Sequence, residues 1–438
     1  MLFYGLFSLQ HRGQESAGIA YRKDGSLVAY KNLGMVATVL SRYLREERFS
    51  NVGIGHVRYS THGGNRIENA QPVLATCNKG QIAISHNGNI CNAREIAGRL
   101  VDEGSIFQST SDTELMLHLI ARSRLPAFSE ALVETLRQLD GAYSLVMIHD
   151  NSLIVARDGF GFRPLFIGDK NGTTVVASET CALNMLKVED YRAVEPGELI
   201  RIDADGRHCE HIDTQDNYGH CVFELIYFAR PDSSVFDHSV HLVRKKMGAA
   251  LADADDVTAD VVLPVPDSGN SAALGYAEQS GIPFELGLTR NHYAGRSFIL
   301  PTSAERELAV RMKLHPVRQV IEGRRVILVD DSLVRGTTAI TLVKLIREAG
   351  AREVHLRLAS PELKWPCYFG IDIPTSGELI SNRMSPRQIA HAVGAESVRF
   401  LPISVLEGCV ARPGDFCYAC FNGDYPVEVG AKDKERFS

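Results

Sequence analysis

The sequence predicts two successive α/β domains, first an αββα sandwich of antiparallel sheets and then a parallel sheet covered by helices. In the first half, short alternating strands are separated by Gly- and Asn-rich turns, the pattern of stacked antiparallel sheets with helices outside. In the second half, residues 326–338 read VILVDDSLVRGTT, an apolar β-branched run that leads into two carboxylates and a Gly/Thr-rich turn. Such a run is typical of a parallel strand buried on both faces.

Length and composition limit the kind of protein. A chain of 438 residues with 45% hydrophobic residues has room for two or three globular domains. The net charge of −6, without any long Lys/Arg run, argues against a general nucleic-acid surface. No apolar stretch is long enough to span a bilayer, and no signal peptide opens the chain. We therefore expect a cytoplasmic protein that acts on small molecules, with no nucleic-acid or membrane partner.

The residues after the apolar run at 326–329 form a candidate phosphosugar site. Ligands of open α/β sheets gather beyond the carboxyl ends of the strands, where Asp330 and Asp331 fall. The following turn offers hydroxyls, backbone N–H groups and a helix N-terminus to a phosphate, through Ser332, Arg335, Gly336, Thr337 and Thr338. The carboxylates would then hold ribose hydroxyls or Mg²⁺. Two acids after a strand can also be a solvated turn, but the complete string favours the phosphosugar site.

This string resembles the phosphoribosyl diphosphate (PRPP) signature of type I phosphoribosyltransferases. The resemblance implies that the acidic pair meets the ribose hydroxyls and that the loop binds the 5′-phosphate. By itself the string fixes the ligand better than the reaction, since nucleobase salvage enzymes, PRPP synthetases and PRPP-binding transcription regulators also carry it.

Two further stretches match the same domain. Ser268, in VVLPVPDSGNSAALG, matches a position that helps to hold Mg²⁺ with Asp330 and Asp331. The stretch LGLTRNHYAGRSFILP resembles a mobile loop that closes over PRPP, with Arg296 and Lys313 as candidate diphosphate contacts. Serine at 303 stands where the family commonly has glutamine, so we expect loop closure to differ.

The first half resembles a glutamine amidotransferase domain of the N-terminal-nucleophile type, over residues 1–210. The motifs are YGLFSLQHRGQESAGIA, GIGHVRYSTHGG, ISHNGNI and STSDTE. The resemblance implies that Arg58 binds the α-carboxylate of glutamine and that Asp112 takes its α-ammonium. It also implies that Asn87 and Gly88 stabilise the oxyanion. These roles suit the donor and acceptor types of the four groups.

The nucleophile of that family is absent from the printed sequence. The family's mature chain begins with a cysteine whose own α-amine serves as base, whereas this sequence begins Met1-Leu2. We expect a start assigned too late or a clipped chain, because the other glutaminase motifs remain. The alternatives are a variant that uses only free ammonia and a non-catalytic PRPP-binding regulatory protein. As written, the chain is expected not to hydrolyse glutamine.

Four of the nine cysteines form a candidate metal-binding set. Cys417 and Cys420 make a C-x-x-C, a spacing that suits either one metal centre or plain burial. With Cys221 and Cys367 they look like the four [4Fe–4S] ligands of the iron–sulfur class of amidophosphoribosyltransferase. The resemblance implies a structural cluster that ties the sheet domain, residues 211–425, to its C-terminal segment. A charged, flexible tail is expected at 426–438.

The resemblance to that family covers nearly the whole chain and implies its function. The reaction would convert PRPP, glutamine and water into 5-phosphoribosylamine, glutamate and diphosphate, the committed step of purine synthesis. Residues 227–233, YFARPDS, are candidates for the wall of an ammonia channel. Purine nucleotides are expected as feedback inhibitors and a homo-oligomer, a tetramer, as the assembly. A PRPP-sensing regulator would need a basic DNA-binding element, which neither terminus supplies.

Overall fold

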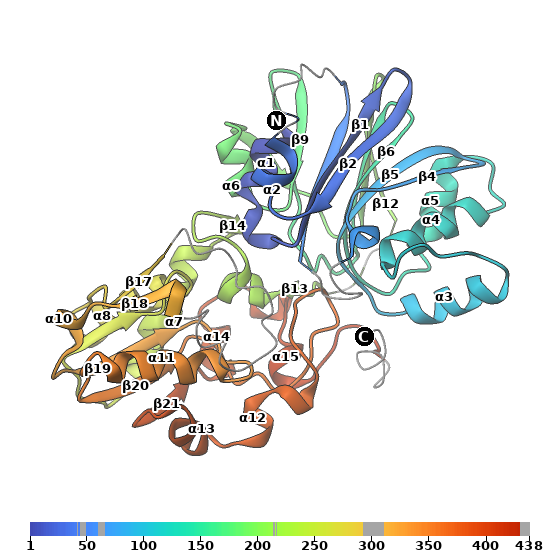
Figure 1. Ribbon diagram of the computed structural model, residues 1–438. Helices are drawn as coiled ribbons and strands as arrows, with labels where there is room; N and C mark the ends of the chain where they lie inside the picture. Colours follow the sequence, from blue (N-terminus) through green and yellow to red (C-terminus); the bar gives the residue numbers. More distant parts are fainter. Residues whose placement is uncertain are drawn as a thin grey trace.

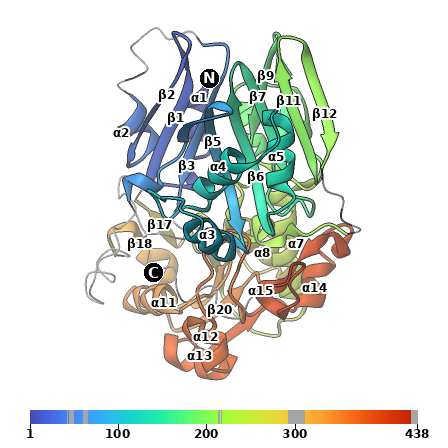
Figure 2. The ribbon, with the colours of Figure 1, turned by 90° about the vertical axis from the view of Figure 1, so that its right-hand side faces the viewer.

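The computed structural model describes residues 1–41, 43, 50–59, 66–212, 215, 217–291 and 311–429 (Figure 1). Antiparallel sheets fill the N-terminal part, and a parallel sheet lies at the centre of the C-terminal part. The two parts stand one above the other in Figures 1 and 2, with the parallel-sheet part below. The predicted fold class is therefore confirmed. None of the described helices combines the length and the apolar character that crossing a membrane requires.

Three antiparallel sheets build the N-terminal part over the residues that the structure describes. The first has the order β2-β1-β3, from β1 (Ser16–Lys23), β2 (Ser26–Leu33) and β3 (Gly53–Arg58). The second has six strands in the order β12-β11-β7-β6-β5-β4, from β4 (Val73–Cys77), β5 (Gly80–Ile90), β6 (Gly141–His149), β7 (Ser152–Arg157), β11 (Glu198–Asp203) and β12 (Gly206–His211). The third has the order β10-β8-β9, from β8 (Phe166–Lys170), β9 (Thr173–Ala177) and β10 (Asp190–Ala193).

Helices cover both outer faces of these sheets. Between the first two sheets, Ala20 and Ile54 pack with Ala83 and Ile148 in one buried cluster. α1 (Leu2–Ser8) and α2 (Val36–Leu40) lie on the first sheet, and α6 (Thr180–Met185) lies beside β9. α3 (Ala93–Asp102), α4 (Asp112–Arg122) and α5 (Phe128–Leu136) cover the six-stranded sheet. The layers are thus helix, sheet, sheet, helix, because each sheet has an apolar face on either side to bury.

The C-terminal part is a parallel sheet between two helical layers. Its order is β16-β19-β20-β21, from β16 (Val261–Pro264), β19 (Arg325–Asp330), β20 (Glu353–Leu358) and β21 (Ser397–Phe400). Val262 and Ile327 join the buried cluster that includes α7 (Val240–Asp253) and α8 (Asn270–Ser280). Val261 and Val326 join the cluster that includes α11 (Thr337–Glu348) and α13 (Pro386–Val393). Successive side chains point to opposite faces of a strand, so a continuous apolar run serves both layers.

Short elements complete the chain and connect its two parts. They are η1 (Gln10–Arg12), η3 (Ile67–Asn69), β13 (His220–Cys221), η4 (Glu224–Phe228), β14 (Ser234–Val235), β15 (His238–Ser239), β17 (Leu288–Arg290), β18 (Leu314–Pro316), α10 (Arg318–Ile321), η5 (Ser376–Glu378), α12 (Ile380–Arg383), α14 (Ile403–Glu407), η6 (Pro413–Asp415), β22 (Phe416–Cys417) and α15 (Ala419–Asn422). β13 pairs in parallel with β22, which brings Cys221 opposite Cys417. β12 ends at His211, next to the expected domain boundary at 210, and that boundary stays a prediction.

Candidate active site

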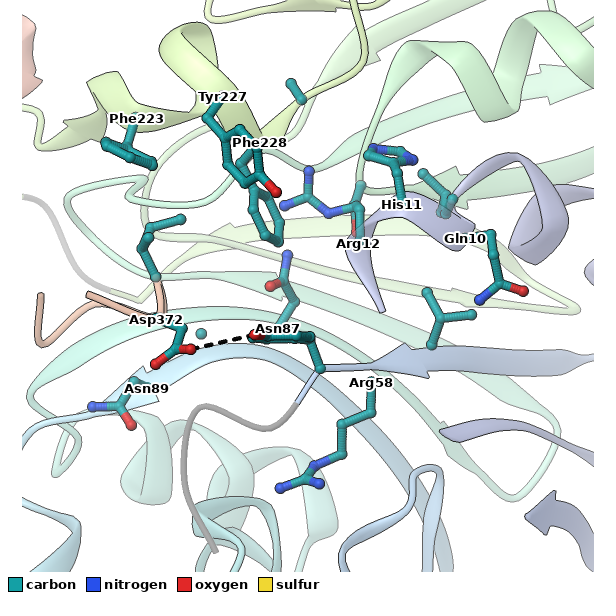
Figure 3. A pocket seen from close by; sticks show the side chains of 18 of the residues that line it. Gln10, His11, Arg12, Arg58, Asn87, Asn89, Phe223, Tyr227, Phe228 and Asp372 are labelled. Atoms are coloured by element: carbon teal, nitrogen blue, oxygen red, sulfur yellow. Dashed lines mark hydrogen bonds between the residues drawn. The ribbon is translucent and has the colours of Figure 1, made fainter. Parts of the chain in front are cut away.

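A cavity of about 1010 Å³ lies between the two parts of the chain and is lined by both. Arg58, Asn87 and Asn89 of the sandwich lie across it from Phe223, Tyr227 and Phe228 (Figure 3). The proposed glutamine residues Arg58, Asn87, Gly88 and Asp112 line the same cavity as Ser268, Ser332, Arg335 and Thr338 of the candidate PRPP site. One continuous space therefore reaches both groups of predicted site residues.

The predicted oxyanion donors lie near the C-terminal end of the long strand β5. Asn87 Nδ2 is buried and makes no hydrogen bond to another described residue, so this donor can serve a ligand. Gly88 has φ +155°, and a Cβ built on it would lie 2.0 Å from the carbonyl oxygen of Ala142 on β6. Only glycine fits there, because β6 occupies the space that a side chain would need. Arg58 ends β3 and is 8% exposed.

The predicted ammonium-binding acid, Asp112, is held from two sides. It is the first residue of α4, whose N-cap Ser111 accepts a hydrogen bond from Thr113 N at 3.3 Å. Asp112 Oδ2 accepts a hydrogen bond from Ile90 N at 3.1 Å, and Asp112 Oδ1 lies 3.3 Å from His86 Nδ1. Burial lowers the pKa of His86, because it disfavours the charged imidazolium. The Asp112 carboxylate has the larger effect with its charge and its hydrogen bond, so the pKa of His86 lies above its usual value. The imidazole is thus a neighbour that competes with a ligand for Asp112.

The two carboxylates predicted at the end of β19 lie close together. Asp331 N donates a hydrogen bond to Asp330 Oδ1 at 2.9 Å, and the Ser332 hydroxyl donates to Asp331. Burial, with the neighbouring Asp331 carboxylate, raises the pKa of Asp330 well above its usual range, whereas a hydrogen bond with Ser268 opposes the shift. Two hard carboxylates and a hydroxyl are the donor set that Mg²⁺ accepts, with further ligands from substrate phosphates and water. These residues therefore fit that ion.

The predicted phosphate loop opens α11. Gly336 is its N-cap with φ +81°, and a Cβ there would lie 2.6 Å from Ile380 Cδ1. The left-handed turn leaves the first N–H groups of the helix, at Thr337 and Thr338, without intrahelical partners. Arg335 donates a hydrogen bond to Glu378 at 2.9 Å and lines the cavity. The turn therefore offers backbone donors and one cation to an anion.

The two predicted diphosphate contacts have different outcomes. Arg296 lies outside the described residues, as does most of the loop from which it comes. Lys313 is half-buried just before β18, and it is not among the described residues that line the cavity. Its role as a contact stays a prediction.

A buried charge network that the sequence analysis did not single out joins the two parts beside the cavity. Arg12 lies 2.5 Å from Glu179 and 2.7 Å from Glu224, so it bridges the sandwich and η4. Arg163 lies 2.9 Å from Glu224, and neither side chain is exposed. Both guanidinium groups also stand over the ring of Phe228, at 4.5 and 4.8 Å. Glu224 within the apolar string CVFELIYF was the available signal, since an acid in a buried run needs a buried partner.

The four predicted cluster cysteines come from three segments and influence one another. Burial, together with charge at Cys367, raises the pKa of the Cys221 thiol to about 12, although the Arg163 guanidinium opposes this shift. Cys420 is also buried, and charges at Cys367, Cys417 and Cys221 all act on it. Among the described residues, no three Cys, His, Asp or Glu side chains form a site for a single metal ion. Each thiolate of a [4Fe–4S] cluster binds its own iron, so four neighbouring thiols still fit that group.

Comparisons with known proteins agree with this two-part architecture. A family model described as a glutamine amidotransferase domain matches residues 56–185. The amidophosphoribosyltransferase of Methanocaldococcus jannaschii is 46% identical over 98% of this chain and 94% of its own length. That of Bacillus subtilis is also 46% identical, over 98% of this chain and 91% of its own length.

Solved structures give the same result. The structure of glutamine PRPP amidotransferase from B. subtilis, complexed with ADP and GMP, superposes with a TM-score of 0.91 at 44% identity and covers 98% of this chain and 95% of that one. A structure described as the allosteric regulatory enzyme of purine biosynthesis has a TM-score of 0.93 at 45% identity, with 99% of this chain and 94% of that one covered. The fold and the cavity define a pentosyltransferase joined to a glutamine amidotransferase domain. The chain belongs to the amidophosphoribosyltransferase family.

Proposed function

We propose that the chain forms 5-phosphoribosylamine and diphosphate from PRPP and ammonia, as the committed step of purine synthesis. Glutamine supplies the ammonia when the family's N-terminal cysteine, which the printed sequence lacks, is present. The observation that carries the proposal is the single cavity that reaches from Arg58 and Asn87 to Ser332 and Thr338. Ammonia released at one end can therefore reach ribose C1 at the other end within the same cavity. Tyr227–Pro231 line this cavity, which supports the predicted channel wall.

At the glutamine end, each group of the substrate has a matching residue. The Arg58 guanidinium binds the α-carboxylate and Asp112 the α-ammonium. Asn87 Nδ2 and the Gly88 N–H would donate to the oxygen that becomes negative when the family's N-terminal cysteine attacks the carboxamide. Because these donors are fixed on an inner strand of the sheet, little reorganisation is needed when the charge develops.

At the PRPP end, the residues hold the substrate and stabilise the leaving group. The turn 332–338 binds the 5′-phosphate, and Asp330 and Asp331 bind the ribose hydroxyls and, with Ser268, Mg²⁺. When bound, Mg²⁺ supplies positive charge to the leaving diphosphate. Arg296 and Lys313 add cationic contacts to the diphosphate. Exclusion of water from C1 once both substrates are bound would keep water from competing with ammonia there.

The predicted cluster, regulation, assembly and location belong to the same proposal. Cys221, Cys367, Cys417 and Cys420 hold a structural [4Fe–4S] cluster, supported by the electrostatic influence of the thiols on one another and by the burial of Cys221 and Cys420. Purine nucleotides inhibit the enzyme, and a homo-oligomer is its assembled state. The B. subtilis relative, solved with ADP and GMP, supports nucleotide binding. The protein acts in the cytoplasm.

The test is PRPP-dependent release of diphosphate by the anaerobically purified chain with Mg²⁺, with ammonium or glutamine as the nitrogen source. Release with ammonium supports the phosphoribosyl half, and release with glutamine supports both halves. Asp331→Asn should abolish release from either source, whereas Asp256→Asn, at a side chain that is 93% exposed, should leave it unchanged. Release from neither source by the unaltered protein would overturn the proposal.

A further inference from the structure

A segment of the parallel-sheet part, residues 367–372, runs against the strand that carries the oxyanion donors. Asn89 Nδ2 on β5 donates a hydrogen bond to the carbonyl oxygen of Tyr368 at 2.8 Å. The Cys91 thiol lies 3.5 Å from the same oxygen. At the far end of the segment, the Tyr59 hydroxyl donates to Asp372 at 3.4 Å (dashed in Figure 3). The segment therefore contacts the glutamine end of the cavity at both of its ends.

Between these contacts the two backbones touch. Gly370 has φ +97°, and a Cβ built on it would lie 3.1 Å from both the Cα and the carbonyl carbon of Gly88. These are backbone atoms of an inner strand, so they cannot turn aside as a side chain would. Phe369 is 2% exposed and stacks on Phe162 of the sandwich, with ring centroids 4.2 Å apart. This anchor holds Gly370 against Gly88.

From these contacts we infer that Tyr368–Asp372 positions the glutamine site from the other domain. The inference rests on the proposed function and adds a group of positioning residues to it. The segment fixes the backbone of β5 at Gly88 and Asn89. Ile90 N, one residue further, holds Asp112, so a displaced β5 disturbs the ammonium site as well as the oxyanion donors. Glutamine then binds well only while this segment is docked.

The same segment begins at a predicted cluster ligand. Phe369 N donates to Cys367 Sγ at 3.3 Å, which fixes the thiol relative to the anchor. Two residues separate the cysteine from the Gly370 contact. Loss of the cluster that the four thiols are proposed to hold would therefore release residues 367–372. Strand β5 would then become less ordered at the glutamine site.

The direct test is Gly370→Ala, with glutamine binding measured by calorimetry and PRPP binding measured on the same sample. The added methyl pushes against Gly88, and we expect glutamine affinity to fall about tenfold or more, as for a lost hydrogen bond to a charged group. PRPP affinity should stay within about twofold, a change below 1 kcal/mol. Gly281→Ala is the matched control, since Gly281 is also left-handed, with φ +71°, but has no atom within 4 Å of the added carbon.

Two further measurements keep the inference open to refutation if Gly370→Ala fails to fold. Asn89→Ala removes the bond to Tyr368 without adding volume, and it should also weaken glutamine but not PRPP. Hydrogen exchange at residues 86–91 should quicken in both variants, and in the unaltered protein after oxidative loss of iron. Unchanged glutamine affinity and exchange in a folded variant would overturn the inference alone. If the unaltered protein bound neither PRPP nor glutamine, the proposed function itself would be overturned.

Discussion

The most demanding prediction concerns Glu224, whose carboxylate lies buried between two guanidinium groups. Arg163 has no exposed surface, and its 2.9 Å contact with Glu224 is its only ion pair among the described residues. Glu224→Gln keeps the shape but removes the charge, so Arg163 is left buried without a counter-charge. Breaking such a pair from one side costs about 3–5 kcal/mol. Arg12 loses one of its two acidic partners but keeps Glu179.

Scanning calorimetry measures the effect. A loss of about 1 kcal/mol lowers the midpoint of a domain of this size by ~2–4 °C, so we expect a fall of roughly 10 °C. The midpoint is preferable to an unfolding free energy, because a two-domain chain need not unfold in one step. Glu322→Gln is the control, since its pair with Arg318 is exposed, at 59% and 63%. It should cost about 0.5 kcal/mol or less.

A double variant separates charge from packing. Arg163→Met combined with Glu224→Gln removes both charges and should recover part of the loss, because no buried charge is then left alone. A midpoint for Glu224→Gln within about 2 °C of the unaltered protein would refute the reasoning, since it falls below the shift from 1 kcal/mol. So would a double variant that is less stable than the single one.

Three further predictions concern the sites. Because the pKa of Asp330 is raised and the ion needs the carboxylate, Mg²⁺-dependent PRPP binding should strengthen as pH rises through that pKa; a pH titration should lose this slope in Asp330→Asn. The raised pKa of His86 means that its pairing with Asp112 stabilises the fold below pH about 6.5 and is lost as pH rises through the folded pKa. Glutamine affinity should rise over the same pH interval, because Asp112 is freed from His86. Calorimetry at several pH values measures this affinity, and the same dependence on pH in His86→Gln would contradict the prediction. Cys420→Ser should lose the iron and visible absorption of anaerobically purified protein, and iron content equal to that of the unaltered protein would count against the cluster.

Local pattern was sufficient for much of the fold. The apolar run at 326–329 predicted a strand buried on both faces, and the structure places its alternate residues in two different clusters. The resemblance at ISHNGNI implied Asn87 and Gly88 as donors, and Asn87 Nδ2 is a buried donor without a partner among the described residues. Such features depend on side-chain periodicity and on residue type, both of which can be read along the chain.

Contacts between distant segments could not be predicted in the same way. Arg12 meets Glu224 across more than two hundred residues, and neither string specifies its partner. The contact of Gly370 with Gly88 depends on how the two domains dock. Because glycine has no side chain, its residue type does not indicate which segment packs against it.

The sequence by itself determined the two domain types and the family motifs, and it predicted which groups would bind glutamine, PRPP, Mg²⁺ and a four-thiolate cluster. Only the tertiary structure decided that the two sets of binding residues share one cavity, which charges are buried at the junction and which backbone supports the oxyanion strand. The physical reason is that residue type sets what a group can bond to, whereas packing across the chain sets which partner it meets and how far water is excluded.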